Sequence, residues 1–212
     1  MKIHNDIIQG TDEWLHLRKG VATCSNFSQI LTPKTEKIST SLDKYAKKLA
    51  LELSYKNLKA GFKSAAMEAG NELEPKARQL YQEQKLVKVK EVGFITSDCG
   101  NWGYSPDGLV GDKGLIEIKC LEAEAHSNLI LGGCKEIPSC HNPQVQGGLW
   151  ISEREWCDFV CYNQEIKNPS KQLIIIRVER DEEFIEKLKG GIDKVIQLRD
   201  EYLTRIMESG NE

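Results

Sequence analysis

The 212-residue sequence has few prolines, no long apolar run and no secretion signal. With 6 Pro, 17 Gly and 29% charged residues, it is neither collagen-like nor of low complexity. No stretch approaches the roughly 20 apolar residues of a bilayer-spanning helix, so we expect no membrane association. The first residues lack the apolar run and small-residue cleavage site of a secretion signal, which predicts a cytoplasmic protein.

The sequence also lacks paired cysteines. Its 7 cysteines are an odd number and include no C-x-x-C pair, which indicates reduced thiols rather than disulfides. Cys134, Cys140 and His141 lie close together in the sequence, but they lack the paired ligand spacing of structural zinc sites. We therefore expect neither a disulfide framework nor a zinc site.

An excess of positive charge, which is usual in proteins that bind nucleic acids, is absent too. The formal net charge is -3 and the pI is near 5.9. Carboxylates that bind metal ions count as negative in this charge, although the bound cations offset them. The net charge therefore does not exclude a metal-dependent protein that acts on nucleic acid.

Apolar spacing predicts helices and strands in a definite order. We expect helices over residues 11–18, 25–31, 42–58, 64–84, 122–131, 143–150 and 181–207, and strands over 86–95, 102–105, 115–120, 156–162 and 173–178. Pro75 must either kink the fourth helix or lie in the first turn of a new one, and the first three strands should form a meander. This order predicts an α/β fold in which helices flank a central sheet.

We expect a single domain over residues 1–212, because a chain of this length can bury one sizeable core. A helical N-terminal part should run to about residue 85 and a sheet core from about 86 to 180. A C-terminal helix should close the domain from about residue 181 to 208.

Three ionisable residues fall on or beside the central strands. Because side chains alternate along a strand, Glu117 and Lys119 point to one face and Ile118 to the other. A hairpin with the preceding strand would bring Asp107 next to Glu117. Two carboxylates so close repel each other unless a cation lies between them, and hard oxygen ligands suit Mg²⁺ or Mn²⁺. The main-chain carbonyl of Ile118 would supply another oxygen.

Such a cluster can hydrolyse a phosphodiester. A bound metal polarises a phosphate oxygen and lowers the pKa of a bound water, while Lys119 would orient that water or stabilise the transition-state charge. The alternative is an Asp-Gly turn beside an exposed ion pair between Glu117 and Lys119, which would contribute little stability. A Pro-Asp sequence at hairpin distance from an apolar-flanked Glu-x-Lys favours the catalytic interpretation.

Residues 105–108 (Ser-Pro-Asp-Gly) and 115–120 (Leu-Ile-Glu-Ile-Lys-Cys) resemble the catalytic core of the lambda-exonuclease (YqaJ-type viral recombinase) family, within the PD-(D/E)xK nuclease superfamily. Blocks at residues 10–25, 70–78 and 143–150 resemble further motifs of the family, in the same order. The resemblance implies a restriction-endonuclease-like PD-(D/E)xK core, with a mixed central sheet flanked by helices.

The resemblance also assigns roles to residues. It implies that Asp107 and Glu117 hold two metal ions per site, that Glu74 helps to bind the second ion, and that Lys119 serves the attacking water. Glu74 is one of several acids on its expected helix, so a solvated surface position is the alternative.

Four further residues match motifs of the family. Gln144 matches a glutamine near the site, with Gln146 as a competitor, because positions two apart on a helix face different ways. Arg18 and Ser25 resemble the pocket for a DNA 5′-phosphate; the alternatives are a surface arginine and a plain helix cap. Met67 lies where the family can place an apolar wedge that parts the terminal base pair, and a core position is the alternative.

The activity that the resemblance implies is a 5′-to-3′ exonuclease on double-stranded DNA ends. It would release mononucleotides and leave 3′ single-stranded tails for phage-type recombination, in the cytoplasm of a bacterium or a phage-infected host. The resemblance also implies a homotrimeric ring and a phage-type single-strand annealing protein as partner. A structure- or sequence-specific DNA endonuclease and a non-catalytic DNA-binding subunit are the alternatives, because the catalytic motif does not encode where a nuclease cuts.

Overall fold

The computed structural model describes residues 1–56 and 65–208, and for residues 65–71 it describes the backbone alone. The helices are α1 (Asp12–Leu17), α2 (Leu42–Ser54), α3 (Ala65–Lys85), α4 (Ala123–Leu131), α5 (Asn142–Ile151) and α6 (Glu182–Met207), with 3-10 turns η1 (Cys24–Gln29), η2 (Ser139–His141) and η3 (Pro169–Lys171). The strands are β1 (Lys2–His4), β2 (Ala22–Thr23), β3 (Val89–Lys90), β4 (Phe94–Thr96), β5 (Trp102–Tyr104), β6 (Gly108–Val110), β7 (Gly114–Cys120), β8 (Trp156–Tyr162) and β9 (Leu173–Glu179).

The strands form two mixed sheets. The larger sheet has the order β3-β6-β7-β8-β9, in which β7 and β8 are parallel and the other pairs antiparallel. The parallel pair requires a crossover, and α4 and α5 lie in that connection. The smaller sheet has the order β1-β4-β5-β2. The predicted α/β fold, with mixed sheets flanked by helices, is confirmed.

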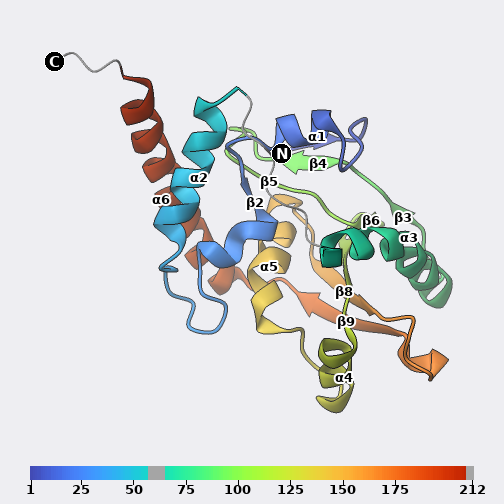
Figure 1. Cartoon of the computed structure of the whole chain (residues 1–212). Helices are drawn as coiled ribbons and strands as arrows, with labels where there is room; N and C mark the ends of the chain where they lie inside the picture. The colour runs from blue at the N-terminus through green and yellow to red at the C-terminus, as the bar shows by residue number, and fades with distance from the viewer. Residues whose placement is uncertain (57–64, 209–212) are drawn as a thin grey trace.

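Two apolar cores lie on opposite faces of β7. Ile116 and Ile118 pack with Ala77 and Tyr81 of α3, whereas Leu115 belongs to the larger core on the other face. This larger core takes its side chains from η1, α2, α5 and α6, and Figure 1 shows α2 and α6 side by side at one end of the molecule. The alternation along β7 is the one that the sequence predicts, and it leaves Glu117 on the face opposite α3.

The expected meander of three strands is wrong. The predicted strand over residues 86–95 is two strands in different sheets, because the chain crosses from β3 to β4 after Lys90. The strand expected over 102–105 is β5, which joins the smaller sheet. The antiparallel partner of β7 is instead β6, whose three residues are too few to show a period. Strands β1 and β2 also lie in the part that was expected to be helical.

The helices follow the sequence more closely than the short strands do. Thr11 caps α1 by accepting a hydrogen bond from the Trp14 amide, at 3.3 Å. Helix α3 continues through Pro75 without a break, and α2 ends at Ser54. The expected end of α2, at residue 58, lies outside the described residues. Within the described ranges, no helix is long and apolar enough to cross a membrane.

Candidate active site

The turn before β6 brings Asp107 to the larger sheet beside β7. Gly108 pairs with Ile116 in the antiparallel ladder, so Asp107 follows in register next to Glu117. The Asp107 Oδ2 atom accepts a hydrogen bond from the Ile118 amide, at 2.6 Å. The structure therefore brings together the two carboxylates that the sequence predicts to be neighbours, although β6 makes the hairpin and the expected strand over residues 102–105 does not.

Glu117 is the most enclosed acid of the site, with an exposed fraction of 1%. Its Oε1 atom accepts hydrogen bonds from Lys119 Nζ, at 2.8 Å, and from the side-chain amide of Gln144. Its Oε2 atom accepts a hydrogen bond from the Tyr104 hydroxyl, at 2.8 Å. Donors from β5, β7 and α5 thus converge on one carboxylate.

The charges of this cluster perturb one another. Burial raises the pKa of Asp107 well above its usual value, and the negative charges of Glu117 and Glu74 raise it further. Burial lowers the pKa of Lys119, but the charges of Glu117 and Asp107 more than offset this, so the ammonium stays protonated. A cation would relieve the repulsion between the carboxylates, and hard oxygen donors suit Mg²⁺ or Mn²⁺. The donor set therefore fits a divalent metal ion.

Glu74 lies on α3 near this cluster, but its carboxylate is engaged by Arg78. The Arg78 Nε atom also donates to the Asp107 main-chain carbonyl, at 3.0 Å, and its Nη1 atom lies 2.8 Å from Glu91 Oε2. Burial raises the pKa of Glu74, as does the charge of Glu117, while Arg78 lowers it. Among the described residues, no three acidic, histidine or cysteine side chains already form a metal cage. The role of Glu74 as a metal ligand stays a prediction.

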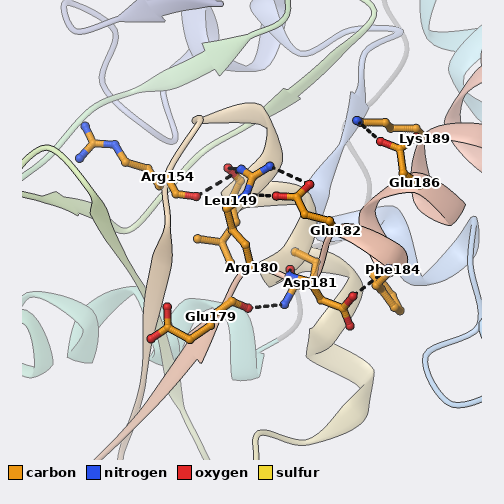
Figure 2. A network of polar contacts seen from close by, with 10 residues as sticks. Leu149, Arg154, Glu179, Arg180, Asp181, Glu182, Phe184, Glu186 and Lys189 are labelled. Carbon is orange, nitrogen blue, oxygen red and sulfur yellow. Dashed lines mark hydrogen bonds and ion pairs between the residues drawn. The ribbon is translucent and has the colours of Figure 1, made fainter.

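The two glutamines of α5 have different surroundings. Gln144 contacts Glu117, whereas Gln146 is buried and spans the turn between β9 and α6. Gln146 donates to the Glu179 carbonyl and accepts from the Asp181 amide, both at 2.9 Å. Figure 2 shows Glu179 and Asp181 in the network that ties this turn to α5. Of the pair, Gln144 is therefore the residue that faces the candidate active site.

Arg180 adds further contacts to the same network. Its Nη1 atom donates to the main-chain carbonyls of Leu149, at 2.7 Å, and Arg154, at 3.2 Å. Its Nε atom pairs with Glu182 at 2.7 Å, as Figure 2 shows. These contacts fix the C-terminal end of α5, and so help to hold the helix that carries Gln144.

Arg18 occupies a separate pocket between α1 and the smaller sheet. Its guanidinium carbon lies 4.1 Å from the centre of the Trp14 ring and 5.4 Å from that of Phe94. Its Nη1 atom donates to Ser105 Oγ, at 2.9 Å, and burial lowers its pKa. Over residues 1–56 and 65–208, it forms no ion pair with a carboxylate. A guanidinium enclosed in this way suits an external anion.

Ser25 is not a helix cap and does not share the cavity of Arg18. The N-cap of η1 is Thr23, and Ser25 lies one residue inside the turn. Arg18 lines a cavity of about 1060 Å³, while Ser25 lines another of about 320 Å³ with Lys119, Gln144 and His141. Arg18 and Ser25 thus line different cavities in this structure, and their joint role in binding a 5′-phosphate stays a prediction.

Comparisons with known proteins agree with this geometry. The YqaJ-like viral recombinase domain matches residues 13–155. The chain belongs to this family. An alkaline exonuclease (LHK-Exo) from Laribacter hongkongensis is 34% identical, with a TM-score of 0.81 over 92% of this chain and 97% of that chain. Its complex with dAMP gives a TM-score of 0.80 at the same identity and coverage. The predicted resemblance is confirmed.

A more distant structure shares the fold alone. A phage-related exonuclease from Haemophilus somnus 129PT is 18% identical, with a TM-score of 0.67 over 87% of this chain and 96% of that chain. No protein with curated annotation matches the sequence.

Sequence reasoning missed four residues of this YqaJ-like site. Arg78 lies one turn after Glu74 in a block that the sequence analysis singled out, and Ser105 directly precedes the Pro-Asp pair, so both had a signal in their position. Tyr104 had none, and His141 was considered only as a zinc ligand. Burial lowers the pKa of His141 to about 4, with help from the charge of Lys119, so a neutral imidazole lines the smaller cavity. The side chain of Met67 lies outside the described residues, so its role as a wedge stays a prediction.

Proposed function

We propose that this protein is a divalent-metal-dependent 5′-to-3′ exonuclease on double-stranded DNA, which releases mononucleotides and leaves 3′ single-stranded tails for recombination. The observation that carries the proposal is the convergence of Asp107, Glu117, Lys119 and Gln144 at one end of β7. Family membership and the relative solved as an alkaline exonuclease, alone and in complex with dAMP, support a DNA exonuclease.

Asp107, Glu117 and the Ile118 carbonyl are the proposed ligands of Mg²⁺ or Mn²⁺, with Glu74 as a ligand of a second ion. When bound, the metal supplies Lewis-acid polarisation of the phosphate and a water of lowered pKa. Lys119, held beside Glu117, would stabilise the negative charge that grows on the phosphate, because its ammonium stays protonated.

Gln144 and Arg78 would act without metal contact. The Gln144 amide donates to Glu117 and lies at the rim of the smaller cavity, where it can orient the scissile phosphate or the water. Arg78 engages Glu74 and the Asp107 carbonyl, so Glu74 would have to exchange this partner for a metal ion.

The polarity of digestion would come from Arg18 and Ser25. Arg18 has N–H donors left after its hydrogen bond to Ser105, and a guanidinium can donate two parallel hydrogen bonds to phosphate oxygens. A 5′-phosphate in this pocket would determine which phosphodiester bond of the strand reaches Asp107 and Glu117. Ser25 would contact the nucleotide from the cavity that it lines with Lys119 and Gln144.

The proposed assembly is a homotrimeric ring around the DNA, with a phage-type single-strand annealing protein as partner. Family membership supports both. In a ring, basic residues of three chains would face the duplex together, although each chain has a net charge of -3.

The proposal is tested with a linear duplex that carries a label at one end, with and without a 5′-phosphate, and with a closed circular duplex. We expect Mg²⁺-dependent release of mononucleotides from phosphorylated 5′ ends and an intact circle. Cutting of the circle would support the endonuclease alternative. DNA binding without any digestion would support the non-catalytic one.

A further inference from the structure

The Tyr104 hydroxyl joins the smaller sheet to the catalytic carboxylate of the larger one. Tyr104 ends β5, has an exposed fraction of 1%, and donates to Glu117 Oε2 at 2.8 Å. Burial and the charge of Glu117 raise its pKa well above the usual value, so the phenol keeps the proton that it donates. A buried donor with a charged acceptor makes one of the stronger hydrogen bonds in proteins.

Helix α5 is shaped to accept the Tyr104 ring. A Cβ atom on Gly148 would lie 2.8 Å from the ring carbon that carries the hydroxyl, closer than real contacts allow. Gly148 follows Gln144 by four residues, which places both on the same side of the helix. One face of α5 therefore offers an amide to Glu117 Oε1 and a space for the ring whose hydroxyl reaches Oε2.

We propose that Tyr104 is a positioning residue, which fixes the Glu117 carboxylate for metal binding, and that Gly148 sets the place of its ring. The inference rests on the proposed function, because it assumes that Glu117 is a metal ligand. With Oε2 held by Tyr104, the carboxylate cannot rotate freely about its last torsion, and its Oε1 atom stays turned toward Lys119 and Gln144. A preorganised ligand binds a metal more tightly than one that must be ordered on binding.

The Tyr104→Phe variant tests this, because it removes the hydroxyl and keeps the ring. We measure Mn²⁺ binding by calorimetry on the metal-free full-length protein, without DNA, and the melting temperature without metal. The expected result is a Kd for Mn²⁺ that rises roughly ten-fold, since a hydrogen bond to a charged group is typically of that strength. The Gly148→Ala variant, which would displace the ring, should weaken Mn²⁺ binding in the same direction.

Tyr81→Phe is the matched control. The Tyr81 hydroxyl also donates to a buried carboxylate, that of Asp158, at 2.7 Å, but outside the site. This control should lower the melting temperature about as much as Tyr104→Phe does and leave the Kd for Mn²⁺ within two-fold of wild type. If Tyr104→Phe changes the Kd no more than Tyr81→Phe, the positioning role is refuted. If wild type binds no Mn²⁺, both the proposed metal-dependent function and the positioning role of Tyr104 are refuted.

Discussion

Removal of the Arg18 guanidinium is expected to abolish the preference for a 5′-phosphate. In the Arg18→Ala variant, the N–H donors that remain after the bond to Ser105 are lost from the pocket. A hydrogen bond to a charged group contributes about 1.5–3 kcal/mol, and about 1.4 kcal/mol corresponds to a factor of ten. Loss of even one such bond therefore predicts a roughly 10- to 100-fold fall in kcat/KM on phosphorylated duplex.

The assay compares kcat/KM on 5′-phosphorylated and 5′-hydroxyl duplexes of the same sequence. The hydroxyl duplex is an internal control, because any damage to folding from the lost packing on Trp14 affects both substrates alike. Arg18→Lys should recover only part of the preference for the 5′-phosphorylated duplex, since an ammonium keeps the charge but cannot donate two parallel hydrogen bonds to a phosphate. Arg205→Ala, near the end of α6, is a distant arginine control. An unchanged ratio between the two substrates in Arg18→Ala would refute the phosphate-binding role.

Three further predictions concern the glutamines, the pH dependence and Arg78. Gln146→Ala should lower the free energy of unfolding by about 1–3 kcal/mol, seen in urea titration, because two buried main-chain groups lose their partner. Gln144→Ala should instead lower kcat with little change in stability. The folded-state pKa of Asp107 is raised, so its protonated carboxyl contributes to the free energy of unfolding of the metal-free protein at low pH. This contribution is lost as the pH rises through the folded-state pKa. The melting temperature without metal should therefore fall from mildly acidic to neutral pH, and Mg²⁺ should restore it. In the Asp107→Asn variant, the melting temperature should depend less on pH. An equal slope of melting temperature against pH in wild type and this variant would contradict the account. Arg78→Ala should shift the Mg²⁺ concentration for half-maximal activity several-fold, and an unchanged value would exclude a role for Arg78 in arranging Glu74 and Asp107.

The long helices and strands could be predicted from the sequence because each spans at least one full repeat of its apolar residues. The strands β8 and β9 and the helices α4, α5 and α6 begin and end within one or two residues of their expected limits. The short strands β1, β2 and β6 were not, since two or three residues show no alternation and their pairing depends on distant partners. Asp107 was nevertheless expected beside Glu117, because Pro-Asp-Gly ahead of a seven-residue strand allows a hairpin whichever strand makes it.

The surroundings of the site needed the tertiary structure. Helical spacing alone does not distinguish Gln144 from Gln146, although the family resemblance favours Gln144; the docking of α5 shows that Gln144 faces Glu117 of β7. Tyr104 reaches Glu117 from another sheet, a contact that no local pattern encodes. The sequence also does not show that Arg18 and Ser25 line different cavities, the second of which is lined by Lys119 and Gln144 as well.

The central claim is that Asp107 and Glu117 make a metal-dependent active site. It is tested most directly by digestion of a 5′-phosphorylated duplex with Asp107→Ala across a range of Mg²⁺ concentrations, alongside DNA binding by the same protein. The account predicts that the variant still binds the duplex but releases no nucleotide at any Mg²⁺ concentration at which wild type is active. Digestion by the variant at a rate near that of wild type would contradict it.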